Sequence, residues 1–151
     1  SDILTEKVKL IGKKIVVAGG GLTGMETAEF LQVKGNEVTD IDMLPGLGLG
    51  AFPLVVMDET SRVAQSGVCA MPGHKLAEIH ADHVVLEDTA GYQVTLPCDA
   101  VIMCLGVRPV NQLGEELTGV EHVYMLGDAK KSGRRVTNAI HEAFEVAYNL
   151  M

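Results

Sequence analysis

The residues best suited to chemistry lie where three consecutive glycines separate an apolar run from a helical pattern. Gly19, Gly21 and Gly24 fit the spacing G-x-G-x-x-G. In that spacing the first glycine allows a tight turn, the second lets a phosphate approach the backbone, and the third lets a helix lie close to a strand. A helix that begins at Leu22 would direct unpaired N–H groups at the phosphates. The residues predicted to hold a pyrophosphate are Gly19, Gly20, Gly21, Leu22, Thr23 and Gly24.

An acid at the end of the next predicted strand supplies the second half of a dinucleotide site. The Asp42 carboxylate can accept both hydroxyl groups of an adenosine ribose, and its charge would repel a 2′-phosphate. No Arg or Lys occurs between Asp42 and Arg62 to receive such a phosphate, so the sequence favours NAD(H) over NADP(H). Two alternatives remain open: a purely structural Asp42, and a glycine-rich turn in another kind of α/β protein.

The elements that must position these residues form a strand–helix–strand unit. Ile15–Ala18 is a short apolar run, rich in β-branched residues, and glycine ends it. Apolar residues then repeat at helical spacing from Leu22 to Leu31, and Gly35-Asn36 ends the predicted helix. Val38–Asp42 is predicted as the second strand. The glycines therefore occupy the first turn of a β-α-β unit.

The rest of the chain predicts an α/β fold, with a Rossmann-like parallel sheet flanked by helices and an inserted antiparallel β-meander, in three layers. The further elements expected are a helix over Leu54 to about Ser66, a short strand at "VCAMPG", a three-piece meander within Lys75–Pro97, a strand over Ala100–Leu105, a loop and turn at "RPVNQLGEELTG", a last strand at "HVYMLGDA", a basic loop over Lys130–Arg135 and a helix over Val136–Met151.

Composition excludes several classes of function. The chain has 151 residues, 47% of them hydrophobic, which is enough to bury a core. No apolar run reaches the ~18 residues of a membrane span, and nothing resembles a signal peptide, so a cytoplasmic location is expected. The net charge of −8 argues against nucleic acid or an anionic membrane surface as a partner.

Cysteine and histidine give no sign of a metal site. The three cysteines, Cys69, Cys98 and Cys104, form no CxxC pair, and the five histidines show no ligand spacing. Cys69 and Cys104 lie in apolar, strand-like runs, so buried, reduced thiols are the expectation. The sequence therefore predicts no metal ligand and no catalytic thiol.

Four stretches of the chain resemble the pyridine-nucleotide–disulfide oxidoreductase superfamily of flavoproteins. More narrowly, they resemble the C-terminal part of NADH:flavin oxidoreductases of the old-yellow-enzyme and 2,4-dienoyl-CoA reductase type. The resemblance covers nearly the whole chain and rests on "VVAGGGLTGMETAEFL", "VTDIDMLPGLG", "CDAVIMCLGVRP" and "VYMLGDAKKSGRRVTNAIHEAF". It implies that residues 1–106 form the NAD(H)-binding domain and residues 107–151 the C-terminal segment of an FAD-binding domain.

The resemblance also implies roles for single residues in the intact enzyme, which would pass a hydride from NADH to flavin. Glu26 would approach the nicotinamide, although an acid near a helix N-terminus is also favourable by itself. Gly106 would lie over the cofactor, and Gly127 and Asp128 would contact the flavin ribityl chain. No residue of this chain is expected to act as a catalytic group.

Some features depart from the family pattern. Asp40 is charged inside a predicted strand, where it is expected to reach solvent or a partner. Val110 stands where the family often has asparagine after proline, which weakens any role for Asn111. No redox CxxxxC pair is present, so disulfide reductase chemistry is not implied.

The glycine turn that would bind the FAD pyrophosphate is absent, so the resemblance implies an excised part of a larger flavoprotein whose partners are NADH and the remainder of the parent. The chain alone is expected to show no NADH oxidation with added FAD in a steady-state assay. It is also expected to self-associate through the helix over Val136–Met151, as light scattering would detect. Alternative interpretations are a domain that binds the ADP moiety of FAD, a methyltransferase, and a non-catalytic nucleotide-binding module.

Overall fold

The computed structural model describes residues 2–131 and 136–150, and the chain forms two compact units, Ser1–Leu105 and Gly106–Met151. The elements in chain order are β1 (Lys14–Ala18), α1 (Leu22–Val33), β2 (Glu37–Asp42), α2 (Pro53–Ser66), β3 (Cys69–Pro72), β4 (His74–Ile79), β5 (His83–Asp88), β6 (Gln93–Pro97), β7 (Ala100–Met103), α3 (Gln112–Glu116), the 3₁₀ turn η1 (Gly127–Ala129) and α4 (Val136–Asn149).

The first unit is built on a four-stranded parallel sheet with the strand order β3-β2-β1-β7. Strand β1 lies between β2 and β7, and four of its five residues are buried. Ile15 pairs in register with Val38 on one side and with Ala100 on the other. Continuous β-branched runs are typical of such a strand because a parallel sheet is covered on both faces.

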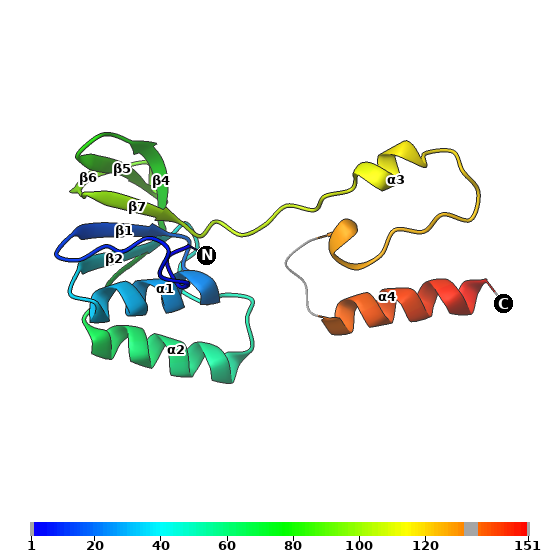
Figure 1. Cartoon of the computed structure of the whole chain (residues 1–151), viewed down its shortest axis with the longest axis horizontal. Coiled ribbons are helices and arrows are strands. Elements are labelled where there is room, and N and C mark those ends of the chain that lie inside the picture. The colour runs from blue at the N-terminus through cyan, green and yellow to red at the C-terminus, as the bar shows by residue number, and fades with distance from the viewer. Residues whose placement is uncertain (1, 132–135, 151) are drawn as a thin grey trace. The chain divides into compact units, whose positions relative to one another are not determined.

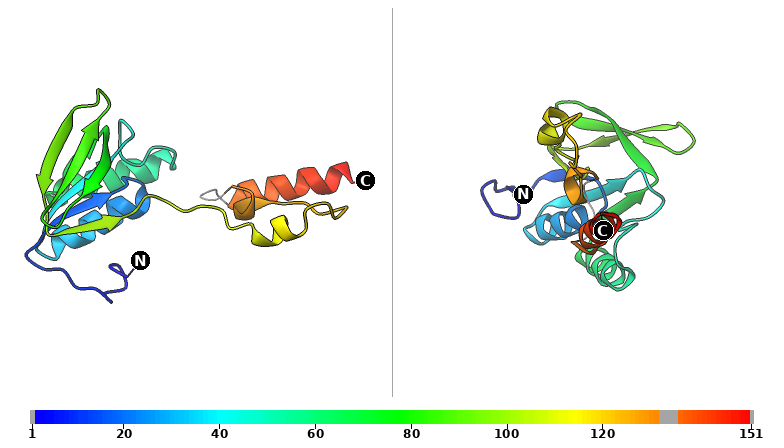
Figure 2. Two further views of the ribbon diagram at one scale, coloured as in Figure 1. Left: turned by 90° about the horizontal axis from the view of Figure 1, so that it is seen from above. Right: turned by 90° about the vertical axis from the view of Figure 1, so that its right-hand side faces the viewer.

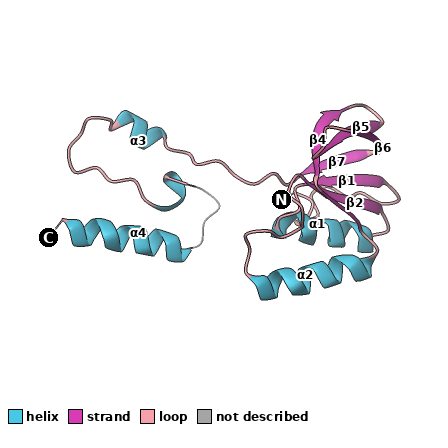
Figure 3. Ribbon diagram, turned by 180° about the vertical axis from the view of Figure 1, so that it is seen from behind, coloured by secondary structure: helices cyan, strands magenta, loops and turns pink. Residues whose placement is uncertain are grey.

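Two different layers cover the sheet (Figures 1 and 3). Helices α1 and α2 pack on one face, where Val17 and Val38 meet Leu31 and Val63 in one apolar cluster. The antiparallel sheet β4-β5-β6 covers the other face, where Val16 and Ile41 meet Leu86 in a second cluster. The three-layer arrangement is also visible from other directions (Figure 2). The predicted α/β fold with an antiparallel meander is therefore confirmed.

The structure corrects several element predictions. "HVYMLGDA" is not a strand, because Val123–Leu126 pairs with no strand of the part described, and Gly127–Ala129 forms a 3₁₀ turn. Apolar composition alone cannot make a strand without a neighbour to accept its hydrogen bonds. The stretch expected to be only loop and turn contains α3. Helix α2 begins at Pro53, which suits the first position of a helix, and β7 ends at Met103.

The second unit holds α3, η1 and α4; α3 and α4 bury no residue, whereas η1 buries Gly127. Large apolar side chains form a stripe along α4 at intervals of four residues, all of them more than half exposed: Val136, Ile140, Phe144 and Tyr148. The ring centroids of Phe144 and Tyr148 lie 6.1 Å apart. Self-association through this helix stays a prediction. Arg134 and Arg135 of the expected basic loop, and the expected helix end at Met151, lie outside the described residues.

The cysteines and one acid differ from expectation. Cys98 is buried, but Cys69 is exposed and Cys104 is only half-buried, and all three are free thiols. Asp40 reaches neither solvent nor a partner: its exposure is 0%, and neither carboxyl oxygen has a hydrogen-bond partner. Among the helices that the structure describes, none is long and apolar enough to span a membrane.

Candidate dinucleotide-binding site

The turn after β1 has a backbone shape that only glycine adopts easily. Gly19 has a φ of 114°, in the region that disfavours side chains, and its N–H donates to the Ile41 carbonyl at 2.8 Å. A Cβ added at Gly19 would collide with the carbonyl oxygen of Cys104. The chain can therefore leave the strand only through a residue without a side chain.

The next two glycines of the motif have opposite surroundings. A Cβ added at Gly24 would collide with the Gly19 carbonyl oxygen and lie 2.9 Å from its carbon. A Cβ added at Gly21 would have nothing within 4 Å. Gly24 is thus required by close helix–strand packing, while no protein atom explains the absence of a side chain at Gly21. Open space at this residue is what a bound phosphate would need.

The N-terminus of α1 is available to an anion. Gly21 is its N-cap, and no side chain caps the helix there. The first intrahelical bond of this end joins the Met25 N–H to the Gly21 carbonyl at 3.0 Å. Gly21 and Thr23 are exposed. Because the first N–H groups of a helix lack partners within it, this end can accept a negatively charged group.

Asp42 braces the turn through its carboxylate. One oxygen accepts the N–H of Gly20 at 2.7 Å, and the other accepts the N–H of Leu44 at 2.8 Å. The side chain therefore lies beside the glycine turn, as the sequence predicts. It also has a structural role, because it accepts two backbone N–H groups. Each carboxylate oxygen can accept more than one hydrogen bond, so both retain capacity for ribose hydroxyl groups.

A loop that sequence reasoning left unassigned closes over the same turn. The N–H of Gly48 donates to the Gly20 carbonyl at 2.6 Å, and a Cβ added at Gly20 would collide with the Leu47 side chain. Gly48 has a φ of 69°. The repeated glycines of "PGLGLGAFP" were the available signal, since a chain that must approach another backbone closely needs residues without side chains.

The turn lies where the strand order of the sheet reverses. The chain moves from β1 to β2 on one side, whereas β7 joins β1 on the other. The Cys104 N–H, just beyond β7, donates to the Ala18 carbonyl at 2.7 Å and holds the two strand ends together. In open α/β sheets ligands bind in the crevice beyond the carboxyl ends of the strands at such a reversal.

Asp40 lies on β2, two residues before Asp42. It pairs in register with Val17 on β1 and Ala70 on β3, and alternation places it on the same face of the sheet as Val38 and Asp42. Burial first, and then the Asp42 charge, raise the pKa of Asp40 from 3.8 to about 7. Burial likewise raises the pKa of the Cys104 thiol, so this cysteine is not an activated nucleophile.

Four further residues are predicted to contact the cofactors. Glu26 is exposed on α1, four residues beyond Leu22. Gly106, Gly127 and Asp128 belong to the second unit. There the Gly127 N–H donates to a carboxylate oxygen of Glu142 at 2.9 Å, and Asp128 is exposed. The cofactor roles of these four predicted residues stay predictions.

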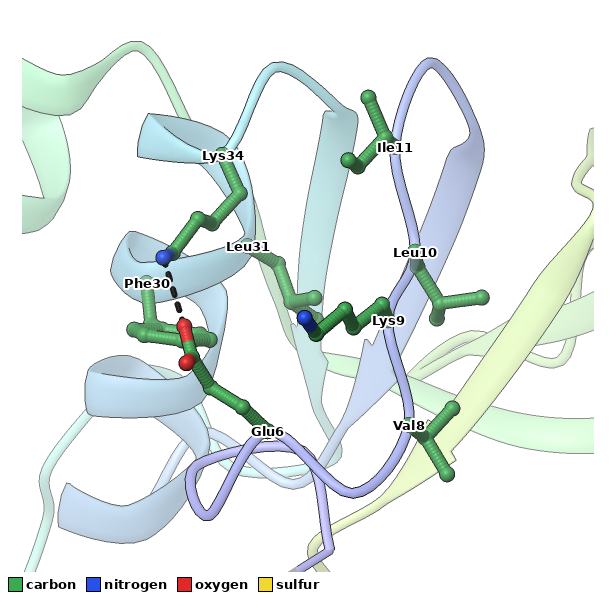
Figure 4. A pocket seen from close by; sticks show the side chains of 8 residues that line it. All are labelled: Glu6, Val8, Lys9, Leu10, Ile11, Phe30, Leu31 and Lys34. Carbon is green, nitrogen blue, oxygen red and sulfur yellow. Dashed lines mark hydrogen bonds and ion pairs between the residues drawn. The ribbon is translucent and has the colours of Figure 1, made fainter.

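A separate pocket lies at the opposite end of α1 (Figure 4). It has a volume of about 190 Å³ and lies between Glu6–Ile11 and the last turn of the helix. The Lys34 ammonium bonds the Glu6 carboxylate at 2.7 Å and lies 5.1 Å from the centroid of the Phe30 ring. The pocket is mostly apolar and lacks the features of the glycine turn. Within residues 2–131 and 136–150, no group of acidic, histidine or cysteine side chains could hold a metal ion.

Comparison with known proteins identifies the family. The model of the pyridine nucleotide-disulphide oxidoreductase family matches residues 2–143, so the chain belongs to that family. Its relatives are oxidoreductases. An NADH oxidase of Thermoanaerobacter brockii is 31% identical over 153 residues, which are 99% of this chain and 23% of the relative. A bilirubin reductase of Mediterraneibacter gnavus is 33% identical over 140 residues, which are 89% of this chain and 21% of the relative.

Solved structures agree on the fold. Histamine dehydrogenase from Rhizobium sp. 4-9 has a TM-score of 0.75 at 20% identity, over 97% of this chain and 24% of that one. A 2-naphthoyl-CoA reductase has a TM-score of 0.72 at 27% identity, over 95% of this chain and 22% of that one. The chain therefore spans about a quarter of the length of these proteins.

Proposed function

We propose that this chain is the NAD(H)-binding part of a larger FAD-dependent oxidoreductase, in which it positions NADH for hydride transfer to flavin. The observation that carries the proposal is the open space at Gly21 beside an uncapped helix N-terminus and the Asp42 carboxylate. The residues Gly19–Gly24 would hold the pyrophosphate, and Asp42 the adenosine ribose. The nicotinamide supplies the hydride chemistry, so the protein contributes placement and electrostatics.

Binding should discriminate between the two nicotinamide cofactors. We expect NADH to bind at least about tenfold more tightly than NADPH, because the 2′-phosphate would approach Asp42, and an unfavourable 1.4 kcal/mol already produces that factor. Fluorescence titration of the 151-residue chain with each cofactor measures the ratio. Tighter binding of NADPH would contradict the ribose assignment, and absence of binding by both would contradict the proposed function.

The parent enzyme is proposed to be an NADH:flavin oxidoreductase of the old-yellow-enzyme type. The support is the resemblance of the four sequence stretches, together with the NADH oxidase relative, which is 31% identical over 99% of this chain. A dihydrolipoyl dehydrogenase of Acholeplasma laidlawii is 28% identical over 95% of this chain, so coverage alone does not separate the two classes of enzyme. Gly106, Gly127 and Asp128 would then face the cofactors in the parent, and Glu26 the nicotinamide. A cytoplasmic location and a homo-oligomeric state stay predictions.

The chain by itself is proposed to bind without turnover. It carries one glycine turn of this kind in its described residues, and the FAD pyrophosphate would need another such turn. Steady-state NADH consumption in the presence of added FAD would contradict this proposal. A yellow purified chain would show that flavin, rather than NADH, occupies the turn.

A further inference from the structure

Asp40 is a buried acid that the proposed site does not use. Its side chain is fully buried, and both oxygens lack hydrogen-bond partners. A carboxylate in such a place loses its hydration without gaining a hydrogen bond, so burial favours the neutral acid. The position therefore holds a proton near neutral pH rather than an ion pair.

No cation in the described surroundings compensates a charge on Asp40. Its sheet neighbours, Val17 and Ala70, are apolar. Helix α1 covers the same face and buries Thr27, whose hydroxyl donates to the Thr23 carbonyl at 2.6 Å. The titratable groups that interact with Asp40 are the thiol of Cys104, beyond β7, and the carboxylate of Asp42, on its own strand. Helix α2, on that face, buries the carboxylate of Glu59, which pairs with Arg62.

Asp40 interacts electrostatically with Asp42, and Asp42 contacts the glycine turn. Asp40 precedes Asp42 by two residues, a rise of roughly 7 Å along a strand. The Asp42 carboxylate in turn accepts the N–H of Gly20 within the turn. Asp40 and Gly20 are both buried, so salt screens an interaction between a charge on Asp40 and the turn only weakly.

We propose that Asp40 links nucleotide binding to a proton: the dinucleotide binds the chain best when Asp40 is protonated, and binding draws a proton onto it. The inference rests on the proposed function, because it needs an anionic pyrophosphate at the glycine turn. An ionised Asp40 would add a second negative charge beneath that turn, beside Asp42, and like charges repel. Linkage is reciprocal, so bound dinucleotide must favour the protonated acid by the same factor.

Isothermal titration of the 151-residue chain with NADH tests the coupling directly. We expect affinity to fall roughly tenfold between about pH 6 and about pH 8.5, as expected for a linkage of one pKa unit. Repeating the titration near pH 7.5 in two buffers of different ionisation enthalpy should show net proton uptake on binding. Asp40→Asn should reduce the pH dependence to less than about twofold and remove the uptake, because an amide cannot titrate.

Matched variants separate this inference from a general charge effect and from the proposed function. Asp58→Asn makes the same change at an acid whose side chain is 73% exposed, and it should keep the full pH dependence. Asp40→Val is a second variant that cannot titrate and suits a buried strand. Affinity that is independent of pH in the unmodified chain, or unchanged pH dependence in either Asp40 variant, would overturn the coupling alone. Absence of NADH binding at both pH values would overturn the proposed function with it.

Discussion

Gly21→Val is expected to abolish measurable NADH binding while the chain keeps its fold. A Cβ at this residue meets no protein atom, and its φ of −71° is accessible to every residue type, so folding loses little. The branched side chain would fill the space proposed for the pyrophosphate. Losing two hydrogen bonds to a charged group, at about 1.5–3 kcal/mol each, corresponds to a loss of affinity of roughly 100-fold or more. Fluorescence titration and a thermal melt of the same sample measure both properties.

Gly24→Ala is the matched control, because it adds a smaller group three residues further on. Here the new Cβ would collide with the Gly19 carbonyl, and both partners lie in tightly packed backbone. We expect the free energy of unfolding to fall by about 3 kcal/mol, as overpacking of a rigid site does. A folded Gly21→Val chain with unchanged NADH affinity would refute the pyrophosphate assignment. A stable Gly24→Ala chain would refute the packing argument.

Asp40→Val is expected to stabilise the chain strongly above neutral pH. Because the pKa of Asp40 is raised from 3.8 to about 7 in the folded state, the folded chain binds the proton more tightly than the unfolded chain. The contribution of Asp40 to stability is therefore greatest below about pH 4, falls as pH rises toward about 7, and levels off beyond, with a total loss of roughly 4 kcal/mol. Valine removes that loss and suits a buried strand, so the melting temperature at about pH 8 should rise by about 10 °C or more.

The pH dependence of unfolding distinguishes this cause from better packing alone. Asp40→Asn is close to the natural residue in shape but cannot ionise, so its stability curve should lose the decline between about pH 4 and about pH 7. Its gain should be smaller than that of Asp40→Val, since the amide stays buried without partners. Urea titrations across this range measure both effects. A decline that persists in Asp40→Asn would assign the pH dependence to another group.

The β-α-β unit and its glycine turn could be predicted because steric rules act locally. Gly19 and Gly24 are needed wherever a strand turns sharply into a close-packed helix, and the order of strand, turn and helix is written along the chain. The predicted strand over Val38–Asp42 also places Asp42 at its carboxyl end, as β2 does. These predictions require no knowledge of distant parts of the molecule.

Predictions failed where the outcome depends on what lies across the sheet or beside a strand. Asp40 was expected to reach solvent or a partner, but α1 and α2 cover its face, and the meander covers the other. Val123–Leu126 has the composition of a strand but no strand partner among the described residues. The predicted C-terminal helix is present as α4, but its exposed apolar stripe does not identify what covers it. Such features are set by long-range contacts that local patterns do not contain.

The double use of the Asp42 carboxylate constrains how cofactor preference can change. The same two oxygens that are proposed to select a ribose also hold the N–H groups of Gly20 and Leu44. Replacing the acid to admit a 2′-phosphate would release two backbone donors at the turn, and each would need a new acceptor. If Asp42 selects NADH as proposed, a variant that adopts NADPH would have to rebuild the loop after β2 at the same time. On the proposed assignment, cofactor selectivity and the architecture of this turn would therefore have to change together.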